Sequence, residues 1–263
     1  MKTFTKSLLA GGIMLAAGAA NAANINIGIS YDPSAESNFQ ALLKSPYVTE
    51  DFDNLGVQGT GAASYGGGGQ AGQQLSWVDS KPTFDTNVGT FTLVQAGQVY
   101  THADLAADDG DNLKIESAAT GEFSREPLSS DGPDDFWLDS NDAKEVTWDF
   151  DSGDVVGTNY DAFGFYLADP ADVAAQLTLH FTDGTSSDAL TIPFEQVNGS
   201  VGYVTVKSDM SIIGGTLTFD NSASNDGWGI DDVTVGKLPE PGTLLLMGLG
   251  LLGLGAARRR TAK

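Results

Sequence analysis

Aspartates crowd the turn-like stretches of this sequence, and turn carboxylates are the ligands that calcium prefers. Four clusters stand out: residues 108–112, residues 131–135, residues 149–154, and Asp226 with Asp231 and Asp232. Ca²⁺ takes about six to eight oxygen ligands from carboxylates and backbone carbonyls. None of the clusters matches the EF-hand loop, and aspartate with glycine is also the ordinary composition of a solvated turn. The clusters predict a structural calcium site, with solvated turns as the alternative.

One calcium site is predicted where the start and the end of the chain's body meet. Residues 50–55 read Glu-Asp-Phe-Asp-Asn-Leu, and residues 229–233 read Gly-Ile-Asp-Asp-Val. If the two terminal strands pair, Asp53 and Asp231 can share one ion. Asp226 and Asp232 are the further candidate ligands. Calcium is the one cofactor that the sequence predicts.

Two tryptophans are candidates for contact with a sugar. Trp137 and Trp228 lie in or beside segments rich in Gly and Asp, which favours exposure. An exposed indole can stack on a pyranose ring because its face is apolar and its rim is polar. The alternative for Trp228, which lies between two glycines, is a packed corner residue. Trp148 alternates with apolar neighbours and is predicted to lie in the core.

Catalytic residues are not predicted. The chain has two histidines, no cysteine, and none of the common nucleophile, phosphate-binding or dinucleotide-binding motifs. The strand pattern Glu-x-Asp-x-x-Glu of laminarinase-type glycosidases is also missing. We expect no enzyme. The alternative is a glycoside hydrolase, which would need two carboxyl groups about 5–10 Å apart.

The body that must position these residues follows a period of two, which is typical of half-buried β-strands. Apolar and polar residues alternate in six short segments, separated by Gly, Asp and Asn turns: residues 90–94, 146–151, 163–168, 176–182, 216–219 and 231–235. This pattern predicts an all-β fold, an antiparallel β-sandwich, over residues 23–237. Helices are expected at 34–44 and 169–176. Residues 61–74, rich in Gly and Gln, are expected to form a loop too flexible to pack.

The charge of the body excludes one class of partner. Residues 23–238 hold seven of the chain's 13 Lys and Arg residues and 34 of its 35 acidic residues, a net charge of −27. A surface this negative repels phosphate backbones. Nucleic acid is therefore not an expected partner.

Both ends of the chain read as targeting signals. Residues 1–22 combine two lysines, an apolar run and Ala20-Asn21-Ala22, which is typical of a signal peptide cleaved after Ala22. At the other end, Thr243 to Ala257 carries no charge and is followed by Arg258, Arg259 and Arg260. These 15 residues fall below the about 17–25 of a spanning helix, which predicts a weak membrane tether with its arginines in the cytoplasm. A plain tail anchor is the alternative.

The tail resembles a known sorting signal. Pro239-Glu240-Pro241, the glycine-broken apolar helix 243–257 and the arginine cluster are similar to the PEP-CTERM signal of Gram-negative bacteria. The segment 238–263 is sometimes labelled an ice-binding-protein-like C-terminal motif, a label that concerns the tail alone. The resemblance implies that a membrane protease, an exosortase, cuts near Pro-Glu-Pro. It further implies passage through the inner membrane, a transient tether, and a final place at the cell surface or outside the cell.

The two ends of the body resemble those of jelly-roll, carbohydrate-binding-like modules, which often pair their first and last strands. The resemblances together imply a surface or matrix protein with a binding or structural role near exopolysaccharide or biofilm. A calcium-dependent carbohydrate-binding module is the alternative. A glycan-active hydrolase is the third reading.

Overall fold

The computed structural model describes residues 23–55, 63–64, 74–75, 77–94, 113–116, 136–140, 143–150, 160–168, 174–193, 200–219 and 228–240. The predicted signal peptide and the predicted apolar helix 243–257 lie outside these residues. Within the described ranges, no helix is long and apolar enough to cross a membrane.

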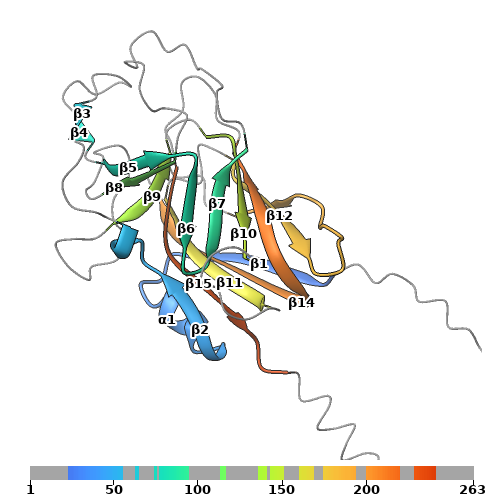
Figure 1. Ribbon diagram of the computed structural model, residues 1–263. Helices are drawn as coiled ribbons and strands as arrows, with labels where there is room; N and C mark the ends of the chain where they lie inside the picture. The colour runs from blue at the N-terminus through green and yellow to red at the C-terminus, as the bar shows by residue number, and fades with distance from the viewer. Residues whose placement is uncertain are drawn as a thin grey trace, which may run out of the picture.

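Strands make up most of the described chain, which confirms the all-β, antiparallel prediction (Figure 1). One short α-helix and one turn of 3₁₀-helix accompany them. In chain order the elements are β1 (Ile25–Ser30), α1 (Ala35–Gln40), β2 (Lys44–Glu50), η1 (Asp53–Leu55), β3 (Ala63–Ser64), β4 (Gln74–Leu75), β5 (Trp77–Lys81), β6 (Thr83–Thr86), β7 (Gly89–Leu93), β8 (Leu113–Glu116), β9 (Trp137–Ser140), β10 (Glu145–Asp149), β11 (Tyr160–Ala168), β12 (Gln176–Phe181), β13 (Leu190–Thr191), β14 (Val201–Thr218) and β15 (Trp228–Lys237).

In the described part of the chain, 13 of the 15 strands form one antiparallel sheet, and the long strand β14 joins its two halves. The first half of β14 pairs with β1 and β11, and its second half pairs with β10 and β12. Where β14 passes between the halves, two steps along β11, from Tyr160 to Ala162, face five steps along β14, from Ile212 to Lys207. Such irregularities let a strand turn a corner between packed layers. The two layers are therefore parts of one folded sheet.

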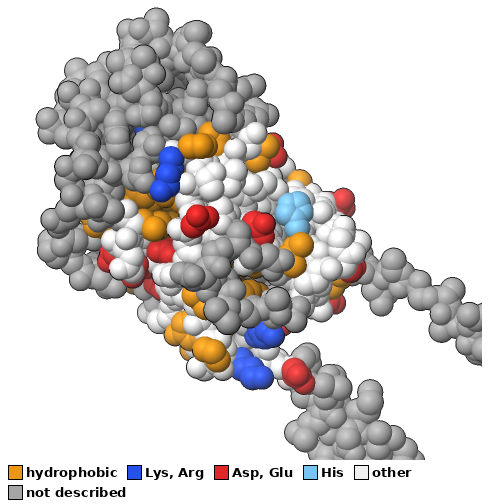
Figure 2. Space-filling model, in the orientation of Figure 1, with side chains coloured by type: hydrophobic (Ala, Val, Ile, Leu, Met, Phe, Trp, Pro, Cys, Tyr) orange, Lys and Arg blue, Asp and Glu red, His pale blue; other side chains and the backbone are white. Residues whose placement is uncertain are grey.

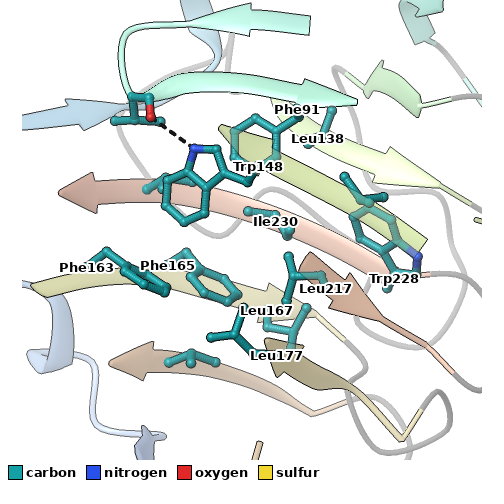
Figure 3. Close-up of a cluster of buried hydrophobic side chains, with 14 of the residues drawn as sticks. Phe91, Leu138, Trp148, Phe163, Phe165, Leu167, Leu177, Leu217, Trp228 and Ile230 are labelled. Atoms are coloured by element: carbon teal, nitrogen blue, oxygen red, sulfur yellow. Dashed lines mark hydrogen bonds between the residues drawn. The ribbon is translucent and has the colours of Figure 1, made fainter. Parts of the chain in front are cut away.

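Aromatic side chains from both layers fill the core (Figure 3). Trp148 of β10 stacks on Phe91, with ring centroids 5.0 Å apart. Its edge meets Phe163 of β11, with centroids 5.1 Å apart, and its Nε1 donates to the carbonyl of Val88 at 2.9 Å. Trp148 is thus the core residue that the alternation predicted, and it links the two layers directly.

The helix α1 covers part of the outer face of the sheet and creates a second, smaller core. Ala35 and Phe39 of α1 pack with Ala162 of β11 and Tyr203 of β14. The rings of Phe39 and Tyr203 lie 6.0 Å apart. The strands below α1 are consequently buried on both faces.

The resemblance to jelly-roll modules led us to expect that the first and last strands pair, whereas the last strand pairs with the second. In β2, Glu50 lies opposite Val233 of β15, and the pairing continues to Lys44 opposite Lys237. The pairing involves β2 rather than the first strand, because β1 lies instead against β14.

Three local predictions need correction. The helix expected over 34–44 covers only Ala35–Gln40, because Lys44 already begins β2. Within the loop expected over 61–74, Ala63–Ser64 and Gln74–Leu75 pair as a two-stranded sheet. Of the helix expected over 169–176, residues 169–173 lie outside the described residues, and Gln176 begins β12.

Candidate functional site

Two consecutive buried aspartates occupy an irregular point of β15. Two steps along β11, from Gly164 to Tyr166, face three steps along β15, from Thr234 to Asp231, so β15 carries one extra residue. Asp232 has a φ of 44°, in the left-handed region that Asp tolerates better than most residues. Its N–H donates to Asp231 Oδ1 at 2.8 Å. A bulge of this kind re-aims side chains, and here it places both carboxylates in buried positions.

The turn after β2 lies beside β15 and is organised by Glu50. Its Oε1 accepts from the N–H of Phe52 at 2.8 Å, and its Oε2 accepts from the N–H of Asn87 at 2.6 Å. Phe52, buried and with a φ of 57°, turns the chain into η1. Burial raises the pKa of Glu50, and the charges of Asp51 and Asp53 add to this, while the two backbone hydrogen bonds act in the opposite direction.

The structure separates the roles of the predicted calcium ligands. Asp53 accepts a hydrogen bond from the N–H of Phe136 at 3.1 Å, so it ties η1 to the start of β9. Asp231 accepts from the neighbouring residue, as described above. Asp226 lies outside the described residues. Among those that are described, no three His, Asp or Glu side chains gather as a metal site would require. The calcium site stays a prediction.

Acidic residues also lie near two tyrosines under α1. The rings of Tyr166 and Tyr203 meet edge to face, with centroids 4.8 Å apart. Burial, and then the charges of Glu36, Asp232 and Asp231, raises the pKa of Tyr166 to about 12. Both phenols are therefore neutral at physiological pH. The two tyrosines serve to pack α1 on the sheet.

Neither candidate tryptophan is exposed, which corrects the prediction of an exposed sugar platform. Trp228 is fully buried, stacks on Phe219 with centroids 4.4 Å apart, and donates from Nε1 to the carbonyl of Ala143 at 3.0 Å. Trp137 is fully buried as well and lies over Gly229 of β15. Because β15 has both faces covered at this point, neighbouring glycines indicate close packing rather than exposure. Neither ring can stack on a surface glycan in this conformation.

His180 lies on the polar side of β12, opposite the buried residues of the strand. Its Nδ1 lies 2.9 Å from Ser186 Oγ, and its Nε2 lies 2.9 Å from Thr216 Oγ1. Both ring nitrogens are thus engaged by hydroxyl groups, of Ser186 in the segment after β12 and of Thr216 in β14. These contacts join the segment after β12 to β14.

The chain leaves the body at the end of β15, directly before the predicted sorting motif. The N–H of Leu238 donates to Asp161 Oδ1 at 2.6 Å, which holds the strand end against β11. Burial raises the pKa of Asp161, against the hydrogen bond from Leu238 and the charge of Lys237, which lower it. Pro239 and Glu240 follow at once and are exposed. Pro241, Arg258, Arg259 and Arg260 lie outside the described residues.

Sequence reasoning missed Glu50 and Asp161. Their partners Asn87 and Leu238 lie 37 and 77 residues away in the chain. Both carboxylates accept from backbone N–H groups, which leave no mark in the types of the neighbouring side chains. No signal in the sequence marks these two contacts.

Comparison with protein-family models matches residues 238–260 to the PEP-CTERM protein-sorting motif. The match spans 23 of the 263 residues, and it confirms the sorting motif predicted from Pro239, Glu240 and Pro241. It indicates an exported surface protein that is targeted to an exosortase. A search of curated proteins finds no match.

Two solved structures show a distant likeness to the chain. The enzymatically active domain of tailspike protein 4 of bacteriophage CBA120 aligns over 62% of this chain and 18% of its own, at 12% identity and a TM-score of 0.25. The K3 cleaved adhesin domain of Lys-gingipain from Porphyromonas gingivalis w83 aligns over 72% of this chain and 98% of its own, at 12% identity and a TM-score of 0.24. This chain thus spans less than a fifth of the tailspike domain. Neither likeness carries an argument at these TM-scores.

Proposed function

We propose that an exosortase cuts this chain near Pro239-Glu240-Pro241, and that the freed body has a binding or structural role in the extracellular polysaccharide matrix. The observation that supports cutting here is the abrupt change at Leu238. Up to Leu238 the backbone is held by β15 and Asp161, and from Pro239 onward the described residues are exposed. A protease needs an extended, accessible segment, and exposed chain beside a hydrogen-bonded strand end offers one.

The place in the matrix rests on the resemblance of the tail, since proteins with this signal tend to occur in bacteria that make exopolysaccharide. The charge of the body fits a protein that works outside the cell, because a net charge far from zero keeps a protein soluble. We propose a non-catalytic role. Release of reducing ends from the polysaccharide by the purified protein would overturn that part.

Processing is tested in the producing bacterium with two variants of the full chain. We expect Glu240→Gln together with Pro239→Ala to leave the protein uncut in the membrane fraction, as loss of the exosortase should for the natural sequence. Asp188→Asn, a matched change at an exposed residue of the body, should be cut normally. Normal cutting of the Pro239 and Glu240 variant would contradict the proposed site.

Calcium-dependent carbohydrate binding is the second candidate, and the two buried aspartates of β15 favour it. Burying two consecutive carboxylates is costly, and a cation is one way to offset that cost. Retention of the protein on the bacterium's own exopolysaccharide should then fall on chelation, and Asp231→Asn should remove the calcium effect. Equal retention with calcium and with chelator would exclude this candidate.

The jelly-roll, carbohydrate-binding-like nature of the body is part of this second candidate. The pairing of β2 with β15 supports it. Since Trp137 and Trp228 are buried, a glycan would have to bind through polar surface groups. Trp137→Phe and Trp228→Phe should accordingly change stability and leave retention unchanged once folding is verified.

A further inference from the structure

Exposed lysines lie at the end of the body from which the chain leaves. Lys44 of β2 and Lys237 of β15 lie opposite each other, just beyond a register shift in the pairing, and both are exposed. Lys207 of β14 lies at the same level of the sheet, since Ala162 is opposite both Lys207 and Gly236. These three are nearly half of the seven basic residues in a body whose net charge is −27. Asp161, whose charge interacts with that of Lys237, and the exposed Glu240 lie at the same end of the body.

Apolar side chains accompany these lysines. Leu42, between α1 and β2, is 47% exposed, and Tyr47 of β2 is 39% exposed. They account for half of the four large hydrophobic side chains that are exposed in the described part of the chain. Figure 2 shows hydrophobic and basic side chains side by side at the end of the body next to the departing chain. We call Leu42, Lys44, Tyr47 and Lys237 the exit patch.

The segment that connects the exit patch to the apolar tail is short. Leu238 is fixed to Asp161, and four residues, 239–242, separate it from the apolar run that begins at Thr243. Even fully extended, the five steps from Leu238 to Thr243 span about 17 Å. The headgroup layer is roughly 5–8 Å thick on each side of a bilayer. With the tail inserted, Leu238 lies at most about 9–12 Å beyond the headgroup layer, which is about one to one and a half Debye lengths at physiological ionic strength.

We propose that the exit patch rests on the anionic phospholipid headgroups of the membrane that holds the tail, until the sorting cut releases the body. The inference rests on the proposed function, because the tail must first be inserted. Each lysine near an anionic surface shifts the contact equilibrium by about fivefold. Tyrosine and leucine beside them suit the interface, where amphipathic and apolar groups are favoured. The anionic headgroups repel the remaining, acidic surface of the body. The body is therefore oriented with the exit patch toward the membrane.

The test uses the full chain, and the natural absence of cysteine allows single labels. A fluorophore on Leu42→Cys reports the exit patch. The control label on Val94→Cys is at a similarly exposed residue, beside Glu145 and the far end of β14. Protein purified from membranes is reconstituted into vesicles of phosphatidylcholine with about one third phosphatidylglycerol, with a headgroup quencher. Flotation of the vesicles measures insertion of the tail separately.

We expect the label at Leu42 to be quenched and the label at Val94 to remain bright. Replacing both lysines, Lys44→Glu with Lys237→Glu, should lower the contacting population by at least about thirtyfold. The matched variant Lys81→Glu with Lys144→Glu changes the net charge equally, away from the exit patch, and should keep the quenching. Vesicles of phosphatidylcholine alone should hold the tail with much weaker quenching.

The outcomes separate the two ideas. Protein that does not float with the vesicles lacks an inserted tail, which overturns the tether of the proposed function and this inference with it. Protein that floats, with equal quenching at Leu42 and Val94, keeps the tether and overturns the exit patch alone. Quenching at Leu42 that needs added exosortase would assign the patch to the protease instead of the lipid.

Discussion

At the scale of single residues, Glu50 joins two stretches of chain that the sequence keeps apart. Each of its carboxylate oxygens accepts one backbone N–H, from Phe52 and from Asn87, and the side chain is buried. Both contacts need an acceptor, and a carboxylate offers acceptors on both oxygens. The turn between β2 and η1, and with it the position of Asp53, therefore depends on Glu50.

Glu50→Gln should destabilise the protein by about 1–3 kcal/mol, because the amide nitrogen must then face a backbone N–H as a second donor. Urea unfolding followed by tryptophan fluorescence measures the change. Glu145→Gln, at a half-exposed position of β10, is the matched control and should stay within about 0.5 kcal/mol of the natural protein. Equal effects of the two changes would contradict the role given to Glu50.

The raised pKa of Glu50 adds a pH dependence to the same comparison. A carboxyl whose pKa is raised in the folded state holds its proton more tightly there, so its contribution is complete below the ordinary value of 4.5. That contribution falls as the pH rises through the folded-state pKa. The stability difference between the natural protein and Glu50→Gln should therefore narrow from pH 4 toward pH 7. A difference that widens would give the pKa shift the opposite sign.

At the scale of elements, the alternation of apolar and polar residues located the strands that have one face on the core. β10 and β12 are such strands, and their inward residues are buried as predicted. The pattern fails in β9 and in much of β15, where residues of both faces are buried. Burial on both faces is what made Trp137 and Trp228 look exposed in the sequence. The contact between residue 50 and residue 233 agrees with the predicted approach of residues 50–55 and 229–233, although the first strand pairs elsewhere. The backbone contacts of Glu50 and Asp161 were not predictable.

The packing of β9 on β15 yields a prediction about glycine. A Cβ on Gly229 would lie 2.1 Å from Cζ3 of Trp137, which is buried and cannot move aside. Gly229→Ala should therefore cost about 1–3 kcal/mol through overpacking. Gly28→Ala in β1, whose Cβ would meet its nearest neighbour at 3.8 Å, should be nearly neutral. Chemical unfolding of both variants decides this, and a neutral Gly229→Ala would contradict the packing described.

At the scale of the whole molecule, the net charge of −27 over residues 23–238 opposes compact folding. Screening shortens the reach of this repulsion from about 30 Å at 0.01 M salt to about 10 Å at 0.1 M. The urea midpoint should rise over this range of NaCl at pH 7. At pH 4, where many carboxyl groups are protonated, the same salt change should have a smaller effect. If salt leaves the urea midpoint unchanged at pH 7, the charge repulsion does not lower the stability of the folded state.

At the same scale, the body ends where Asp161 holds the end of β15, and the sorting segment begins there. The most direct test is the intact mass of the protein recovered from the producing bacterium's surface and culture fluid. We expect a chain that begins at Ala23 and ends near Pro239-Glu240-Pro241, without Arg258, Arg259 and Arg260. A surface protein whose mass includes the apolar run and the arginine cluster would contradict it.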